Sequence, residues 1–236
     1  MKKLSFILLI LLASCASSRV QEVFRATDIF WTPDRQLHFS DYQSELNDGC
    51  VWYIETFATQ TFANIDFRWV VDVPRRWRGA NAGKIDKGYI VPVFCRVCSC
   101  ILSKDTLSLK VDLLLFDVAE AFARNIRRDI NAIQIEMNIR NPNLMWFYTI
   151  KNIEAEEMRR FAIQILRDIF VDKTENAYEN WRRVVNQSLE QSIALATTDD
   201  DRRRFTSGRP IVAGYIQARS VEGDLRSRNT NENRNQ

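Results

Sequence analysis

The chain has 236 residues, of which 46% are hydrophobic and 27% charged, and these fractions are typical of a folded globular protein. Its formal net charge of +3 falls to about +1 without Lys2 and Lys3, so no strong overall field attracts nucleic acid. His38 is the one histidine of the sequence. This count excludes a zinc site built on two or three histidines, and any histidine-dependent nucleophilic catalysis must recruit His38 itself.

The first fifteen residues have the pattern of a secretory signal. Lys2 and Lys3 precede an apolar run over residues 4–12, which is shorter than the roughly 20 residues that a membrane-spanning helix needs. The run ends in Leu-Ala-Ser-Cys at residues 12–15, which resembles the bacterial lipobox, in which the cysteine is acylated and becomes the mature N-terminus. We therefore expect residues 1–14 to be a lipoprotein signal peptide, and residues 15–28 to hold the lipidated Cys15 and a tether.

This anchor predicts a place on a membrane of the bacterial cell envelope. Ala16 and Ser17 follow the lipidated cysteine and provide no acidic retention signal, which favours the outer membrane. No acidic cluster follows Cys15 closely, which favours a body that faces the periplasm. No later stretch of the sequence is apolar for long enough to span a membrane.

The first part of the body has the composition of β-structure. A strand is predicted over residues 29–39, broken by a turn at residues 32–35, with His38 facing solvent. A second is predicted over residues 50–73, which are rich in β-branched and aromatic side chains. A third is predicted over residues 89–102, where Pro92 favours an edge position or a bulge.

Helix spacing begins after Lys104. Apolar residues recur at intervals of three and four from Leu109 to Met137, with Asp105 placed to cap this helix and Pro142 to end it. Further helices are predicted over residues 153–170 and from residue 174, then a solvated charge run at 199–204 and a late strand within 210–217. Strands before helices indicate an α+β fold, an N-terminal antiparallel sheet followed by two or three long helices. We expect one domain over residues 29–219 and a disordered tail over residues 220–236.

Four cysteines follow Cys15, and an oxidising envelope makes them candidates for disulfides. On the predicted strand Cys98 and Cys100 share one face and Cys95 the other, and neighbours on one strand do not bond to each other easily. We expect a disulfide that joins Cys50 to Cys95 or to one of the two cysteines after it, with the remaining pair buried as thiols. Four free thiols are the alternative, and a four-thiolate zinc site lacks the two separate Cys-x-x-Cys hairpins of structural zinc sites.

The long predicted helix carries three acids that are candidates for catalysis, Asp112, Asp117 and Glu120. Paired carboxylates can serve a glycan hydrolase if they face an open cleft. The plainer interpretation is salt bridging along the helix surface with Arg124 and the arginines after it.

The polar loop after the second strand is a candidate binding surface. A tryptophan among arginines can stack on a sugar or hold an anionic partner, or it can simply anchor the loop. The residues are Arg75, Arg76, Trp77 and Arg78.

Residues 113–120 read Leu-Leu-Leu-Phe-Asp-Val-Ala-Glu, followed by Ala-Arg at 123–124 and Arg-Arg at 127–128. This segment resembles the helix L-x-H-E-x-x-H-F-D-I-A-E-x-x-A-R-x-x-R of a family of secreted bacterial proteins of unknown function, predicted zinc peptidases that are often lipoproteins. Trp31 with Leu-His-Phe-Ser-Asp-Tyr at 37–42 is similar to the family's opening W…L-x-W-x-D-F. Asp-Lys-Thr-Glu-Asn-Ala at 172–177, followed by Trp181, is similar to its later D-x-x-T-x-H-G…W. The resemblance implies a zincin-like helix–sheet core over residues 30–191.

The chain departs from this family at the positions that bind the metal. The two histidines of H-E-x-x-H fall on Val111 and Leu115, the glutamate falls on Asp112, and the later histidine falls on Asn176. Valine and leucine have no electron pair to give to zinc, and zincin chemistry needs both histidines and the glutamate. The resemblance therefore implies a pseudoenzyme, a peptidase scaffold that holds no metal or other cofactor.

Together these observations predict a non-catalytic envelope lipoprotein that acts as a binding or accessory protein. It is expected to contact the membrane through the lipid on Cys15 and to bind no nucleic acid. Its partner is expected to be an envelope protein or a peptide, which an edge strand can take up by β-addition. The alternatives are a carboxylate-based hydrolase that uses the helix over residues 109–130, and a structural tether that docks through the loop at 75–78.

Overall fold

The computed structural model describes residues 27–75, 84–136 and 144–218. A four-stranded antiparallel sheet has the order β1 (Asp28–Phe30), β4 (Lys87–Cys95), β3 (Ile65–Pro74) and β6 (Tyr215–Gln217), and β2 (Thr61–Phe62) pairs with β5 (Cys100–Ile101). The α-helices are α2 (Asp48–Phe57), α3 (Thr106–Glu136), α4 (Leu144–Leu166), α5 (Ala177–Gln191) and α6 (Asp199–Ser207). Short helical turns are η1 (Phe39–Asp41), η3 (Arg96–Cys98), η5 (Ile193–Leu195) and the π-helical η4 (Arg167–Val171). The predicted α+β class is confirmed.

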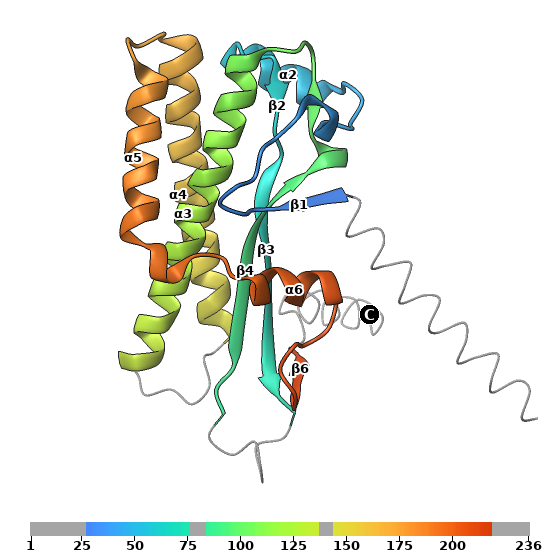
Figure 1. The fold of residues 1–236 in the computed structure, drawn as a ribbon, viewed down its shortest axis with the longest axis vertical. Coiled ribbons are helices and arrows are strands. Elements are labelled where there is room, and N and C mark those ends of the chain that lie inside the picture. The colour runs from blue at the N-terminus through green and yellow to red at the C-terminus, as the bar shows by residue number, and fades with distance from the viewer. Residues whose placement is uncertain (1–26, 76–83, 137–143, 219–236) are drawn as a thin grey trace, which may run out of the picture.

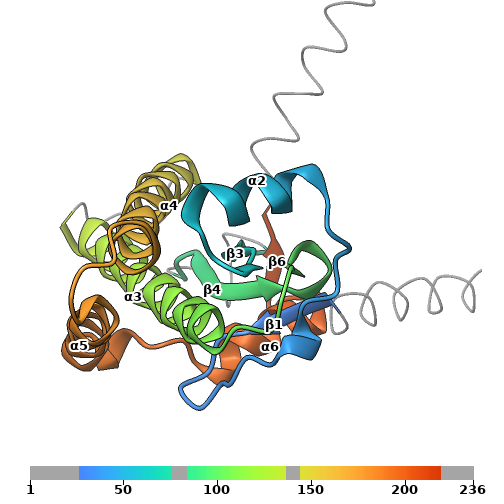
Figure 2. The same cartoon turned by 90° about the horizontal axis from the view of Figure 1, so that it is seen from above.

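Helix α3 is the centre of the molecule, because it packs on the sheet and on the two other long helices. Figures 1 and 2 show α3, α4 and α5 together on one side of the sheet, with α6 beside β1 and β4. Ile126, one of the apolar residues at the predicted intervals, lies in the main apolar core, and Phe116, another of them, lies in a second core beside Phe94. Val111, Leu114 and Val118 also belong to the main core. Asp105 caps the helix as predicted, since its Oδ2 accepts the Ser108 N–H at 2.7 Å. The predicted end at Pro142 lies outside the described residues.

The predicted strand over residues 50–73 is wrong in its first half, which forms helix α2. The Asn47 side chain accepts the Cys50 N–H at 3.1 Å and caps the helix. Cys50, Ile54 and Phe57 are buried at helical intervals, so burial of this stripe outweighs the strand preference of the aromatic and β-branched residues between them. The strand prediction holds for β3.

Strand β4 lies inside the sheet, so the expected edge position of Pro92 is wrong. In an antiparallel pair, Pro92 faces Trp31, and the Pro92 carbonyl accepts the Trp31 N–H at 3.1 Å. The reciprocal bond would need an N–H that proline lacks. The Arg202 guanidinium donates to the Trp31 carbonyl instead, at 3.2 Å, which explains how an inner strand accommodates the proline.

Of three other local predictions, one is confirmed and two are wrong in part. The late strand is confirmed as β6, whereas the strand expected over residues 29–39 ends at Phe30 and His38 lies exposed just before η1. The charge run at 199–204 forms α6, and its last residue, Arg204, is buried rather than solvated. The zincin-like core implied by the resemblance stays a prediction.

Candidate functional site

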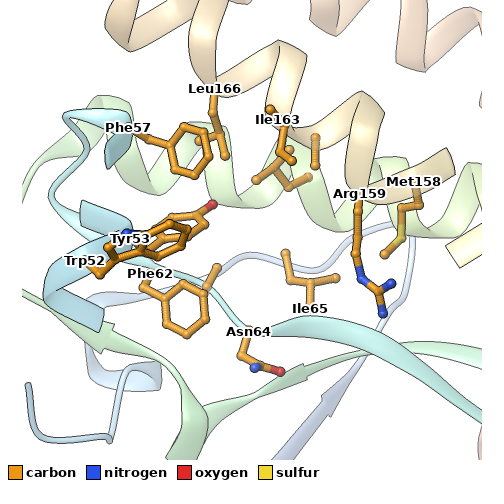
Figure 3. A pocket seen from close by; sticks show the side chains of 13 residues that line it. Trp52, Tyr53, Phe57, Phe62, Asn64, Ile65, Met158, Arg159, Ile163 and Leu166 are labelled. Atoms are coloured by element: carbon orange, nitrogen blue, oxygen red, sulfur yellow. The ribbon is translucent and has the colours of Figure 1, made fainter. Parts of the chain in front are cut away.

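An apolar groove opens between α2 and α4 over the start of β3 (Figure 3). Its volume is about 310 Å³, at the lower end of the range of pockets that hold small ligands. Thirteen residues line it, and most are aromatic or aliphatic: Trp52, Tyr53, Phe57, Phe62, Ala63, Asn64, Ile65, Leu115, Met158, Arg159, Ala162, Ile163 and Leu166. These residues belong to α2, the β2–β3 segment, α3 and α4, so the groove exists only in the folded chain.

Aromatic rings from α2 and β2 form one wall of the groove. Tyr53 packs on Phe57 and on Phe62, with ring centroids 4.9 Å and 4.7 Å apart. Trp52 stands at the rim with 65% of its surface exposed, which is unusual for the largest apolar side chain. The opposite wall is one face of α4, because Met158, Ala162 and Leu166 follow each other at intervals of four residues.

Few polar groups face the groove. Arg159 lies at its mouth, where it is mostly exposed and forms an ion pair with Glu156 at 3.1 Å. The backbone of Asn64 is held by two hydrogen bonds, from its N–H to Ser99 Oγ and from the Cys95 N–H to its carbonyl, both at 2.9 Å. The groove therefore suits an apolar group with a polar or anionic end near Arg159.

Two disulfides fix the end of the molecule that carries α2. Cys50 on α2 bonds to Cys100 on β5, and Cys95 bonds to Cys98. The pairing Cys50–Cys95 is thus wrong, although the expected link from Cys50 to one of the three later cysteines is correct. The remaining pair is bonded because Arg96–Cys98 is a 3-10 turn, which brings the two side chains together where a strand would separate them.

We expect the Cys50–Cys100 bond to contribute more stability than the Cys95–Cys98 bond. It joins residues 50 apart, and the loop entropy for this separation corresponds to about 4 kcal/mol, against about 2 kcal/mol for the short loop. Urea unfolding of C50A/C100A and of C95A/C98A would measure both losses. Equal losses from the two variants would contradict this ranking.

Asp112 lies buried on α3 between Val111 and Leu115, the two positions that the resemblance aligns with zinc-binding histidines. Its Oδ2 accepts hydrogen bonds from Tyr42 Oη and Thr61 Oγ1, both at 2.5 Å. Burial raises the pKa of Asp112 to about 7, although both hydroxyl groups act to lower it. Burial also raises the pKa of Tyr42, and the nearby Asp112 raises it further.

The four positions that the resemblance aligns with the zinc-peptidase motif, Val111, Asp112, Leu115 and Asn176, do not fit together as a metal site. Val111 and Leu115 are packed in the apolar core and carry no donor atom, and Asn176 is exposed at the start of α5. Residues at these positions therefore do not fit a zinc ion. Within 27–75, 84–136 and 144–218, no three His, Cys, Asp or Glu side chains lie close enough together to hold a metal.

Asp117 and Glu120, the other two candidate acids of α3, are each paired with an arginine and do not face one common cleft, because Glu120 is fully buried. Asp117 accepts from Trp31 Nε1 at 2.7 Å and pairs with Arg182 of α5 at 2.6 Å. Glu120 is fully buried and pairs with Arg124 at 2.8 Å. The expected Glu120–Arg124 pair is present, but its place on the helix surface is wrong, because both partners are in the core.

Several predicted site residues lie outside the described residues, namely Cys15, Arg76, Trp77 and Arg78. Arg75 is exposed, and its backbone N–H donates to the Gly214 carbonyl at 2.8 Å. Strand β4 is flanked by β1 and β3, so residues 89–102 do not provide an edge strand, and uptake of a peptide by β-addition stays a prediction.

Comparisons of the chain with models of known families, with curated proteins and with solved structures find no match. In the described part of the chain, each helix is too short or too polar to cross a lipid bilayer. The sequence does not indicate the groove, because the composition of residues 50–57 predicts a strand where the structure has α2. The one available signal was the helical interval of Cys50, Ile54 and Phe57 behind a capping Asn47.

Proposed function

We propose that this protein is a non-catalytic, lipid-anchored protein of the bacterial envelope that binds an acyl chain in the groove between α2 and α4. The observation that carries the proposal is the groove itself, walled by aromatic and aliphatic side chains with exposed Trp52 at its rim. Such a lining recognises hydrocarbon, since each buried methylene group contributes about 0.8 kcal/mol.

The chemistry at the mouth of the groove favours a chain with an anionic end. The Arg159 guanidinium lies there on a flexible, exposed side chain and can exchange Glu156 for a ligand carboxylate or phosphate. An exposed ion pair of this kind contributes little to stability, so exchanging its partner costs little. Deeper in the groove the walls are apolar, which suits the hydrocarbon part.

The sequence motif at the N-terminus supports an acyl chain as the occupant. An acylated Cys15 would hold the body beside a bilayer, at the periplasmic face of the outer membrane, where acyl chains are the most abundant apolar groups. The apolar side chains at Val111 and Leu115 support a scaffold without zinc chemistry, and Leu115 itself lines the groove. In this proposal the degenerate motif provides part of a binding surface.

We expect the purified protein to bind dodecanoate in detergent-free buffer, and Ile163→Glu to weaken binding about tenfold or more because it places a charge in the groove. Isothermal titration calorimetry measures the affinity. Ile153→Glu is the matched control, because both isoleucines are exposed on α4, by 56% and 45% for Ile153 and Ile163, and Ile153 does not line the groove. Absence of dodecanoate binding, or equal losses in the two variants, would refute the proposal.

A further inference from the structure

A second cleft lies between the loop after β1 and α5 and encloses about 370 Å³. These two elements lie on the other side of α3 from α2 and α4 (Figure 2). Guanidinium groups from three separate segments line it: Arg35 from the loop, Arg124 from α3 and Arg182 from α5. Leu113 and Leu189 are among its apolar lining residues. Three arginines that converge from distant parts of the chain are a costly arrangement unless something compensates their charge.

The arginines of this cleft have hydrogen-bond donors that are not used. The Nε atoms of Arg35 and Arg182 are closed off from solvent and have no acceptor within the described residues. The Arg35 side chain makes no hydrogen bond or ion pair in that part of the chain, although its backbone N–H donates to the Thr32 carbonyl. A buried donor without an acceptor costs on the order of 1–3 kcal/mol, so native proteins usually supply one.

Neighbouring acids neutralise two of the three arginines and leave Arg35 as the unpaired cation. Arg182 pairs with Asp117, and Asp117 also accepts the Trp31 indole N–H. Arg124 pairs with the buried Glu120, and its guanidinium lies over the Trp31 ring, 5.5 Å from the centroid. These contacts fix the positions of Arg124 and Arg182 before any ligand arrives. The remaining acid of the lining, Glu190, is exposed and forms no ion pair within the described residues.

We propose that this cleft binds an oxyanion, a phosphate or carboxylate group, with Arg35 as its main partner and the Arg182 side chain beside it in the lining. The planar guanidinium presents parallel N–H donors that match the oxygens of either group. The apolar residues beside the arginines lower the local polarity, which strengthens a charged hydrogen bond. The site is independent of the acyl groove, because no residue lines both.

The test is a calorimetric titration of the purified full chain with inorganic phosphate and, separately, with acetate, at constant ionic strength set with chloride. The wild-type protein is expected to bind at least one of the two probes, and the stronger one identifies tetrahedral or planar oxyanions as the ligand class. Arg35→Gln is expected to weaken this binding about tenfold or more, since one charged hydrogen bond is lost. The Arg35 side chain forms no hydrogen bond or ion pair with the rest of the described chain, so Arg35→Gln should keep the wild-type melting temperature.

Two further variants separate a site from general attraction by positive charge. Arg203→Gln removes an equal charge from an exposed position on α6 and is expected to leave the affinity unchanged. Glu190→Gln removes the repelling carboxylate and is expected to tighten binding. Two results would overturn the proposal. The first is that neither phosphate nor acetate binds at millimolar concentration, which would leave water as the partner of the arginine donors. The second is that Arg35→Gln and Arg203→Gln weaken binding equally.

Discussion

Arg204→Met is expected to lower the free energy of unfolding by about 3–5 kcal/mol, because it leaves the Asp72 carboxylate buried without its partner charge. The two side chains are 2% and 1% exposed and form a two-pronged pair, with Nε–Oδ2 and Nη2–Oδ1 distances of 2.7 Å. Arg204 also donates to the Gln217 side chain at 3.0 Å. The pair therefore ties α6 to β3 and β6, and urea unfolding followed by circular dichroism measures its loss.

The neighbouring residue Arg203 provides a matched control for this prediction. It lies on the exposed side of α6, 3.9 Å from Asp200, and Arg203→Met should change the free energy of unfolding by no more than about 0.5 kcal/mol. The double variant R204M/D72N removes both buried charges and is expected to be more stable than R204M alone. A loss below about 1 kcal/mol for R204M, or a double variant no more stable than R204M, would contradict this account.

The buried Arg204 also shows why the sequence revealed only part of this fold. Asp199, Asp200 and Arg203 are exposed, as a solvated charge run predicts, but Arg204 points into the core toward a partner 132 residues away. No local pattern contains that distant carboxylate. Periodicity was sufficient for α3, because one long apolar stripe and the Asp105 cap are both local features.

The sequence does not indicate the candidate sites for a related reason, because the residues of each site lie far apart in the chain. The groove is formed by α2 and α4, which are about a hundred residues apart, and α2 was predicted as a strand from its aromatic content. The oxyanion cleft likewise depends on Arg35 and Arg182, which nothing in the sequence connects. What the sequence did indicate is that Val111 and Leu115 carry no atom that can bind a metal, because that statement needs only the residue types.

Stability is expected to depend on pH through Asp112, with the wild-type protein losing stability relative to Asp112→Asn as the pH rises. Burial raises the folded-state pKa of Asp112 from 3.8 to about 7, so the folded protein holds this proton more tightly than the unfolded chain does. The stabilisation is fully present below about pH 4, falls between pH 4 and 7, and is absent above pH 7. Its size is on the order of 4 kcal/mol, from about 1.4 kcal/mol for each pH unit.

Urea unfolding of both proteins at intervals from pH 4 to 8 measures this effect, because the difference between them cancels the other titrating groups. Asparagine keeps an oxygen that can accept from Tyr42 and Thr61, so the variant resembles protonated Asp112 and should not titrate. Asp105→Asn is a control that should show no pH-dependent difference from wild type between pH 4 and 8, since the hydrogen bond from the Ser108 N–H lowers the pKa of Asp105. Its contribution is present above about pH 4 and is lost only as the pH falls further. A difference between wild type and Asp112→Asn that stays constant from pH 4 to 8 would show that folding does not raise the pKa of Asp112.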